Sequence, residues 1–396
     1  MAEGLLSFRV EKQVFVEAVN HASRSLQSNN VEPILRAITL TADQDDIICA
    51  GYDNEVSNEA RLAAEIFQPG RIAVAGKLLD EITKNLPNQL VNCEVVQSQL
   101  KVTCGSSRFE IPLIPIDEYP PLPKMPEVIG TVDLKEFQQA VAQVSSAAAS
   151  DSSDTLPMLT GMQVHFQGDT IKLTATDRFR LTVRTMKWSP SAADIDAKVL
   201  VPASKLVTVK YLDTAGGDPL ELALGATDAE QRNLLFGLQY QGAKTTMRLL
   251  DGDYPNVDPL IPQMHESMAA VNISELAAAC KRVGVVSSHN DPIRLSFGPE
   301  EVKVTANSSE SGHAEEYVAC EYTGTDQYDI AFNPDYLKNG LNVINTDRVV
   351  FGFTNSARPA IMVPEPEQLP SQNENGEYPR PDTDFVYLLM PVRLPG

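Results

Sequence analysis

Three segments of the chain repeat one helical pattern, and this repetition restricts the fold more than any other feature. The segments are VEKQVFVEAVNHA from Val10, VDLKEFQQAVAQV from Val132 and VNISELAAACKRV from Val271. When they are aligned, the apolar residues fall at i, i+3, i+4 and i+7, which is one face of a helix. Because repeats of this size mark copies of one structural unit, we expect three helices in equivalent places.

The landmarks that follow each helix also recur in the same order. Pro33, Pro157 and Pro292 each precede a predicted strand, a short polar turn and a second strand, a pattern that indicates a hairpin. A second amphipathic helix follows in AGKLLDEITKNL, PASKLVTVKYL and NPDYLKNGLNVI, and two more strands close each repeat. We therefore predict an α+β fold in which two helices pack on about eight antiparallel strands in each copy. The expected domains are residues 1–126, 127–262 and 263–396.

The composition excludes several classes of protein. The chain has 53 acidic and 32 basic residues and a net charge of -21, whereas a simple nucleic-acid binder carries a basic face. No apolar run approaches the roughly 18 residues that a membrane helix needs, and the first residues do not resemble a signal peptide, so we expect a cytoplasmic protein. The cysteines lie in apolar contexts without metal-ligand spacing, so we expect small buried hydrophobes and no metal or cofactor. They are Cys49, Cys93, Cys104, Cys280 and Cys320.

Two acidic clusters are candidates for metal binding or acid–base catalysis. DQDD, residues 43–46, falls between two predicted strands, where Asp is common in turns, and HAEE, residues 313–316, falls on an alternating strand. The chain has no P-loop, no G-x-S-x-G and no H-E-x-x-H motif. The lone Trp188 precedes a loop and is expected to pack against the protein. We expect a binding protein, with a metal-dependent enzyme that uses these carboxylates as the alternative.

The stretch TATDRFRLTV, residues 174–183, differs from its counterparts in the other repeats. Only the second repeat places two arginines beside an aromatic residue here. One interpretation is an exposed hairpin with charges on one strand face. The other is a site with cationic and apolar parts that suits a peptide partner. A triplicated scaffold that binds peptides but not DNA is therefore a further alternative.

Four motifs, in the order of the three repeats, resemble the bacterial DNA polymerase III β-subunit family, the sliding clamps. They are ATDRFRL, DGDYP, FNPDYL and the terminal YLLMPVRL, and the resemblance covers essentially the whole chain. The resemblance implies a head-to-tail homodimer, a closed ring of six similar domains around double-stranded DNA with helices lining the hole. It also implies a processivity factor without chemistry of its own. Such a clamp tethers the replicative polymerase and repair polymerases through short linear motifs, and a separate clamp loader opens it with ATP.

The resemblance also implies a partner-peptide pocket between the second and third domains. Family members often have Gly-His where this chain has Arg178-Phe179, which affects the polar details of motif recognition. The implied pocket residues are Leu159, Thr176, Asp177, Arg178, Phe179, Arg180, Leu181, Pro255, Leu260, Asn333, Tyr336, Ala357, Leu388, Met390, Pro391, Arg393 and Leu394. A Pro/Glu/Asn-rich stretch, residues 364–384, precedes the last strand and has the composition of a disordered loop.

The resemblance places the predicted helices in the hole, where basic residues lie opposite the apolar stripes. Because the Debye length is about 8 Å at physiological salt, rim carboxylates would be screened from this surface. We expect weak, sequence-independent contact with phosphates. The candidates are Lys12, Arg24, Lys77, Lys84, Lys135, Lys205, Lys210, Lys281, Arg282 and Lys338. A head-to-tail ring needs two different edges, for which the candidates are Phe109 and Ile111 on one side and Val285 and Val286 on the other.

Overall fold

The structure is a computed structural model whose chain divides into two compact units. It describes residues 6–26, 32–152, 156–226, 234–286, 291–308, 312–324 and 326–393. The first unit contains Met1–Lys135, Trp188–Ala193 and Tyr211–Leu249, and the second contains Glu136–Lys187, Asp194–Lys210 and Leu250–Gly396. Each unit therefore holds one outer repeat and part of the middle repeat.

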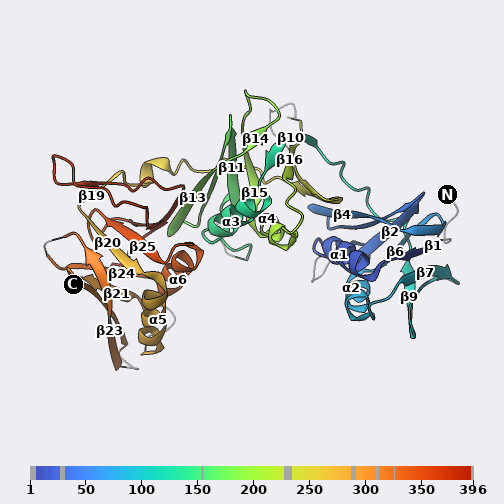
Figure 1. Cartoon of the computed structure of the whole chain (residues 1–396), viewed down its shortest axis with the longest axis horizontal. Helices are drawn as coiled ribbons and strands as arrows, with labels where there is room; N and C mark the ends of the chain where they lie inside the picture. The colour runs from blue at the N-terminus through green and yellow to red at the C-terminus, as the bar shows by residue number, and fades with distance from the viewer. Residues whose placement is uncertain are drawn as a thin grey trace. The chain divides into compact units, whose positions relative to one another are not determined.

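The first unit is built on a 14-stranded antiparallel sheet (Figure 1). Its strand order is β14-β10-β16-β17-β18-β4-β3-β2-β6-β9-β8-β7-β1-β5. The strands are β1 (Ser7–Val10), β2 (Ala37–Asp43), β3 (Asp46–Tyr52), β4 (Val56–Ala63), β5 (Glu65–Gln68), β6 (Gly70–Ala75), β7 (Val91–Val96), β8 (Gln99–Cys104), β9 (Ser107–Ile114), β10 (Glu127–Val132), β14 (Ser189–Pro190), β16 (Leu220–Leu224), β17 (Leu235–Tyr240) and β18 (Ala243–Arg248). The helices are α1 (Lys12–Ser23), α2 (Gly76–Asn85) and the 3-10 helix η1 (Pro33–Arg36).

Helix α1 buries the apolar stripe that the repeat pattern predicts. Phe15, Ala18, Val19 and Ala22 are buried against the sheet, in a core that also includes side chains of α2. The Phe15 ring packs edge-on against Phe8 of β1, with 5.8 Å between the ring centroids. Because burying one large apolar side chain stabilises a fold by about 1.5–3 kcal/mol, this stripe fixes the helix on the sheet.

The second unit contains a 12-stranded sheet and a two-stranded one (Figure 1). The larger sheet has the order β15-β11-β12-β13-β28-β26-β25-β20-β23-β22-β21-β24, and β19 pairs with β27. The strands are β11 (Gly161–Gln167), β12 (Thr170–Thr176), β13 (Arg180–Lys187), β15 (Asp196–Pro202), β19 (Met264–His265), β20 (Ser267–Asn272), β21 (Ile293–Phe297), β22 (Glu301–Ser308), β23 (Gly312–Tyr322), β24 (Tyr328–Phe332), β25 (Arg348–Phe353), β26 (Ala360–Pro364), β27 (Tyr378–Pro379) and β28 (Phe385–Leu389). The helices are α3 (Leu134–Ser145), α4 (Ala203–Leu206), α5 (Ile273–Val283) and α6 (Pro334–Val343), with 3-10 helices η2 (Pro157–Thr160), η3 (Val207–Tyr211), η4 (Asp258–Leu260) and η5 (Gly284–Val286).

The predicted second helix of the middle repeat is shorter than expected. Helix α4 has 4 residues and continues as the 3-10 helix η3. Val207, Thr208 and Val209 are β-branched, and their restricted side chains disfavour an extended α-helix. The other two repeats do not have three consecutive β-branched residues here, and they form ten-residue helices.

The turn between β3 and β4 and the turn between β12 and β13 have the same structure, which confirms the equivalence of the first two repeats at the level of single atoms. The Asp53 carboxylate accepts hydrogen bonds from the backbone N–H groups two and three residues on, at 3.0 and 2.7 Å. The Asp177 carboxylate does the same, at 3.0 and 3.0 Å. The next residues, Asn54 and Arg178, have left-handed φ values of 73° and 80°. In each of these strained turns, the Asp carboxylate is thus the hydrogen-bond acceptor for two backbone N–H groups.

Successive repeats are joined by strand pairing. In the first unit β4 of the first repeat pairs with β18, the last strand of the second repeat. In the second unit β13 of the second repeat pairs with β28, the last strand of the third. Because β4 and β13 hold the same place in their repeats, the two joints between repeats follow one rule: the same strand of one repeat pairs with the last strand of the next.

The stretch of residues 364–384 is ordered, and the expectation of a disordered loop is wrong. Strand β27 within it pairs with β19, and the Arg380 N–H donates to the Gln263 carbonyl at 2.8 Å. Leu369 and Tyr378 pack on a buried cluster of the 12-stranded sheet. A few apolar anchors and backbone hydrogen bonds therefore hold a segment whose composition alone indicates disorder.

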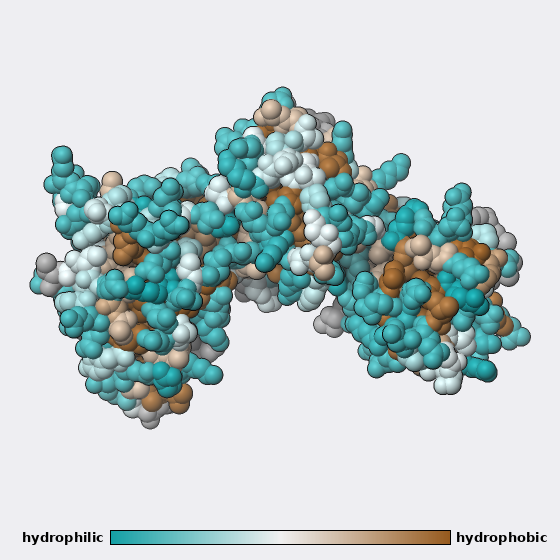
Figure 2. All heavy atoms as spheres, viewed as in Figure 1, coloured by the Kyte–Doolittle hydropathy of each residue, from teal (hydrophilic) through white to brown (hydrophobic). Residues whose placement is uncertain are grey.

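Trp188 and the cysteines lie in the surroundings that the sequence predicts. Trp188 is 6% exposed and packs against Gly130, as expected. The cysteines are free and lie in the protein interior or half-buried. Figure 2 shows that hydrophilic side chains cover most of the visible surface. In the described part of the chain, no helix is long and apolar enough to cross a membrane.

Candidate functional site

The turn after β12 lies beside the end of β28, as the sequence predicts. Arg180 is opposite Leu389 and Leu181 is opposite Leu388 in the β13–β28 ladder. The N–H of Met390 donates to the carbonyl of Phe179 at 2.9 Å. The sheet therefore brings the DRFRL motif and the C-terminal motif together within the second unit.

Arg180 is the cationic centre of this site. Its Nε donates to the Asp177 carboxylate at 2.9 Å, and its guanidinium lies 4.5 Å from the ring centroid of Tyr336 on α6. The Arg180 and Asp177 side chains are each only 11% exposed. Burial lowers the pKa of Arg180, but the Tyr387 hydroxyl and the Asp177 carboxylate outweigh it and hold the pKa above its usual value. Arg180 therefore stays positively charged, and the Asp177 carboxylate compensates this charge.

Exposed apolar groups surround this centre. The Phe179 ring stacks on Tyr336, with 6.1 Å between the ring centroids, and its side chain is 53% exposed. Met390 is 39% exposed at the end of β28. Aromatic side chains and arginine are the residues that carry most of the energy at protein interfaces. The surface formed by Phe179, Tyr336, Arg180 and Met390, here called the aromatic rim, suits the apolar side chains of a peptide.

Two further groups hold Tyr336 in place. The Asn333 side chain caps α6 by accepting hydrogen bonds from the N–H groups of Asp335 and Tyr336, at 2.9 and 3.2 Å. The Tyr387 hydroxyl donates to the Tyr336 carbonyl at 2.8 Å, and burial raises the pKa of Tyr387 to about 12. Asn333, predicted as a pocket residue, therefore acts in this structure as a helix cap.

Four of the predicted residues lie in the protein interior below the site. Leu159, Leu181 and Leu388 are each 2–3% exposed, and Thr176 donates from its hydroxyl to the Arg180 carbonyl at 2.7 Å. Leu159 lies in η2, a 3-10 helix between Pro157 and the strand that the sequence predicts after it. These residues support the site and offer little surface to a ligand.

The other predicted pocket residues lie on connecting segments, and no hydrogen bond or ring contact ties them to the aromatic rim among the described residues. Arg178 occupies the strained turn, and Leu260, in η4, is 58% exposed. Pro255, Ala357 and Arg393 are exposed, Pro391 is partly buried, and Leu394 is outside the described residues.

Sequence reasoning missed two tyrosines that belong to the site. Tyr387 contacts both Arg180 and Tyr336. Tyr254 adjoins Thr176 and Asp177, and burial raises its pKa. Both lie in the quoted motifs DGDYP and YLLMPVRL, but a strand pattern does not show which of its aromatic residues reaches a neighbouring repeat.

The predicted basic residues lie on helices or directly beside them. Arg24 follows the end of α1, and Lys210 lies in η3. Lys84 forms an ion pair with Asp80 at 2.5 Å, and Arg24 lies 4.6 Å from the ring centroid of Tyr211. The exposed members are Lys77, Lys84, Lys135, Lys210, Lys281, Arg282 and Lys338, and the partly buried ones are Lys12, Arg24 and Lys205.

The four predicted interface residues differ in exposure. Val285 is 81% exposed, whereas Ile111 is 1% exposed and belongs to the core of the first unit. Phe109 and Val286 are half-buried. Phe109 and Val285 are therefore the two that offer apolar surface.

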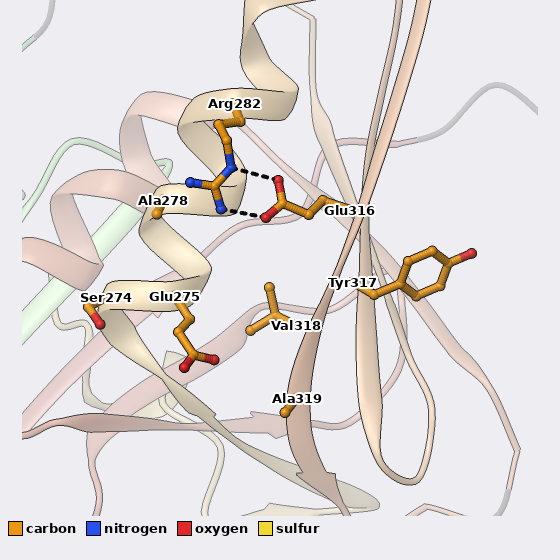
Figure 3. Close-up of a pocket in the computed structure, with 8 residues that line it drawn as sticks. All are labelled: Ser274, Glu275, Ala278, Arg282, Glu316, Tyr317, Val318 and Ala319. Atoms are coloured by element: carbon orange, nitrogen blue, oxygen red, sulfur yellow. Dashed lines mark hydrogen bonds and ion pairs between the residues drawn. The ribbon is translucent and has the colours of Figure 1, made fainter.

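The acidic clusters are engaged in turns and ion pairs. DQDD forms the predicted turn between β2 and β3, and Asp46 pairs with Arg61 at 2.8 Å. HAEE lies on β23, where Glu315 pairs with Lys303 at 2.6 Å and Glu316 pairs with Arg282 (Figure 3). Across the described ranges, no group of three or more His, Cys, Asp or Glu side chains is placed to hold a metal ion.

Three family models match consecutive parts of the chain. They are the N-terminal, central and C-terminal domains of the DNA polymerase III beta subunit, at residues 6–123, 131–256 and 258–373. The chain is 39% identical over 392 residues to the beta sliding clamp of Streptomyces coelicolor, covering 99% of this chain and 100% of that protein. It is 35% identical to the beta sliding clamp homolog GriR of Streptomyces muensis, covering 98% and 99%.

Solved structures show the same fold. The DNA polymerase sliding clamp of Bacillus subtilis matches with a TM-score of 0.85 at 26% identity, covering 98% of this chain and 100% of that one. A sliding clamp of Pseudomonas aeruginosa, solved bound to griselimycin, matches with a TM-score of 0.85 at 24% identity, covering 99% and 100%. The expected three-copy α+β fold is confirmed.

Proposed function

The chain belongs to the bacterial DNA polymerase III beta-subunit family, the sliding clamps, and from this premise we propose that it is the processivity factor of a replicative polymerase. Two copies form a head-to-tail ring around double-stranded DNA in the cytoplasm. The ring tethers the polymerase and repair proteins by their peptide motifs and performs no chemistry itself. The proposed domains are residues 1–126, 127–262 and 263–396.

The observation that carries the ring is the rule by which the repeats join. The β4–β18 and β13–β28 joints each pair the second hairpin strand of one repeat with the last strand of the next. The same rule would pair β23 of the third repeat with β9 of the first, and the chain offers these from its opposite ends. A head-to-tail contact that repeats one rotation generates a ring when that rotation closes. Two copies supply six repeats, and we propose that these six repeats complete the ring.

The helix-borne basic residues support contact with DNA. Lys77, Lys135, Lys281 and Lys338 are exposed on four different helices. A phosphate backbone binds such charges without reading sequence, and its affinity falls with salt. We expect the closed ring to retain the protein on DNA. We expect the lysines to lower the free energy of placing the DNA phosphates inside the ring.

The aromatic rim supports the proposed peptide pocket. Phe179 and Met390 present apolar surface, while Arg180 and Tyr336 fix its orientation from below. A partner motif with apolar side chains would cover this surface. Different partners would bind the same surface in turn.

A loading experiment tests the ring. The labelled protein is loaded by a clamp loader and ATP onto nicked circular DNA, which is then linearised or left intact. We expect retention on circles and loss from linear ends, and a dimer in solution by analytical ultracentrifugation. Equal loss from both DNAs would refute topological tethering.

A peptide titration tests the pocket. Met390→Ser should weaken binding of a fluorescent clamp-binding peptide from a replicative polymerase. Met264→Ser is the matched control, because Met264 is 42% exposed and lies outside the aromatic rim. Unchanged binding by Met390→Ser would contradict the pocket assignment and leave the ring untouched.

A further inference from the structure

The third repeat closes its last hairpin differently from the other two. Cross-strand neighbours, counted from the residue four before the first helix of each repeat, give three equivalent pairs, which are Val102–Phe109, Leu238–Thr245 and Met362–Tyr387. Two residues beyond its pair, the first repeat turns at residues 105–106 and the second at residues 241–242. At the same place the third repeat has residues 365–384, here called the strap. The fold of a repeat therefore does not require the strap.

The strap lies against the segment that connects the second and third repeats (Figure 1). This segment, residues 250–263, is here called the connection, and β19 follows it directly. Strand β27 of the strap pairs with β19, where His265 lies opposite Tyr378. The N–H of Arg380 also donates to the carbonyl of Gln263 at 2.8 Å. The strap therefore holds the end of the connection by backbone pairing.

The strap and the connection cover an apolar part of the 12-stranded sheet. Alternate residues of β28 pack with the helices and on the opposite face of the sheet, here called the outer face. On the outer face, Leu369 and Tyr378 of the strap pack against a buried cluster. The cluster includes Leu181, Val183, Val386 and Leu388 of the sheet and Val257 and Ile261 of the connection.

The same apolar surface has the aromatic rim at one end and the strap at the other. Arg180 of the rim precedes Leu181 on β13. Farther along β13, the N–H of Thr185 donates to the carbonyl of Asp384, the last residue of the strap, at 2.8 Å. The strap therefore bounds the apolar surface beside which a peptide would bind.

The equivalent surface of the first joint is polar. The pair that Thr245 forms with Asn58 is equivalent to the pair that Tyr387 forms with Thr182. One residue to each side, the first joint has the pairs Ser57–Thr246 and Glu59–Lys244, and the second has Leu181–Leu388 and Val183–Val386. A polar surface can face water, whereas an exposed apolar one attracts other chains. The strap therefore occurs at the joint whose outer face is apolar, and the joint with a polar face has a two-residue turn instead.

The other end of the connection reaches the site itself. Tyr254 adjoins Thr176 and Asp177 of the DRFRL turn. Between the two ends, Lys172 of β12 donates from its Nζ to the Asp258 carboxylate at 2.5 Å. The connection thus forms a wall that starts at the turn and ends at the strap. A wall that is already in place does not have to be ordered when a ligand binds, which favours affinity.

We propose that the strap is a positioning element of the peptide site, which holds the connection against the outer face so that a partner peptide meets a preformed wall. This inference rests on the proposed peptide pocket and adds an element outside it. Without the strap, the connection would keep only its contacts at Tyr254 and Asp258 and its apolar packing. A bound peptide would then have to order the wall, so we expect weaker binding, mainly through faster dissociation.

Replacing the strap by a tight turn tests this role in the full-length protein. Residues 365–384 are exchanged for Gln-Gly, because Gln241 and Gly242 close the equivalent hairpin with left-handed φ values of 45° and 82°. We expect the Kd of the fluorescent polymerase-derived peptide to rise about tenfold or more. Sedimentation should remain that of the unmodified protein. Unchanged or tighter peptide binding would overturn the role of the strap.

Point variants keep the test valid if the shortened chain does not fold. Tyr378→Ser removes the ring that packs on the cluster and should raise the peptide Kd about threefold or more. Tyr378→Phe keeps the ring and should bind as the unmodified protein does. Glu374→Ser is the matched control within the strap, because Glu374 is exposed and lies outside β27. Its peptide affinity should not change.

A disulfide gives a reversible second readout. Met264 and Pro379 lie directly opposite in β19 and β27, at the Cα separation of about 4.5–5.5 Å that a disulfide accepts. Met264→Cys and Pro379→Cys are therefore added to the Tyr378→Ser protein. Oxidation should restore most of the lost affinity, and reduction should remove it again. The native cysteines are buried or half-buried and remain in all variants.

The outcomes separate the strap from the pocket. If the unmodified protein does not bind the peptide, the pocket is overturned and the role of the strap with it. If it binds and the shortened and Tyr378→Ser proteins bind equally well, only the role of the strap is overturned. Weaker binding that oxidation of the cysteine pair does not restore would also overturn it, because the loss would then not come from the position of the connection.

Discussion

Lowering the pH should weaken the first unit through one buried histidine, His21 on α1. Its Nε2 donates to the Lys244 carbonyl at 3.1 Å, which ties the first repeat to the second. Its Nδ1 is buried without a hydrogen-bond partner among the described residues. A proton added there would create a buried N–H with no acceptor, so burial lowers the pKa of His21 to about 4.

The size and sign of the effect follow from proton linkage. The unfolded chain takes up this proton near the usual pKa of about 6.5, and the folded chain does so only near 4. The unfolded state therefore binds more protons between these values. The stabilisation is complete above pH 6.5 and is lost as the pH falls toward 4. Between pH 7.5 and pH 5 the loss amounts to about 2 kcal/mol in the free energy of unfolding.

The matched variant is His21→Gln, because the equivalent residue in α3 is Gln143, which makes the same kind of bond to a carbonyl of the next repeat. Urea unfolding of both proteins can be followed by the fluorescence of Trp188, which lies in the first unit with His21. The wild-type protein should lose about 2 kcal/mol more than the variant between pH 7.5 and pH 5. Burial also lowers the pKa of His265 in the second unit, but His265 and all other groups contribute alike to both proteins. Equal losses would therefore refute the coupling.

Three further perturbations have defined outcomes. Asp177→Ala removes the carboxylate that orders the DRFRL turn and should lower peptide affinity about tenfold or more in a fluorescence titration, whereas Asp53→Ala breaks the same turn in the first repeat and should leave affinity unchanged. Tyr387→Phe loses one hydrogen bond and should lower the free energy of unfolding by about 1 kcal/mol, which thermal and urea unfolding would detect; no change would show that water replaces the bond. Val285→Asp should shift the dimer toward monomer in sedimentation, while Leu90→Asp, at another exposed apolar position, should not.

The repeated architecture could be predicted because its signals are local. The apolar spacing around Phe15, Phe137 and Leu276 is fixed by helix geometry, so aligned patterns give aligned helices. The length of α4 could not be predicted from the same spacing, because β-branched residues such as Val207 change helix stability without changing the pattern. The segment of residues 364–384 was misjudged because its order comes from anchors outside it.

The candidate site was predictable only in part, for a related reason. The motifs identified Arg180 and Met390, which adjoin in space because β13 and β28 pair across two repeats. The sequence pattern places Tyr387 in the last strand and does not show that its hydroxyl reaches the Tyr336 carbonyl. Strand periodicity gives the face that a side chain occupies and says nothing of the element beyond it.

The position of β28 has a consequence for the order in which the chain can fold during synthesis. It is made after all the other described strands, yet it lies inside the 12-stranded sheet between β13 and β26. The whole third repeat must leave the ribosome before β13 gains this neighbour. Until then β13 keeps an unpaired edge, which is the kind of surface that aggregates or attracts chaperones.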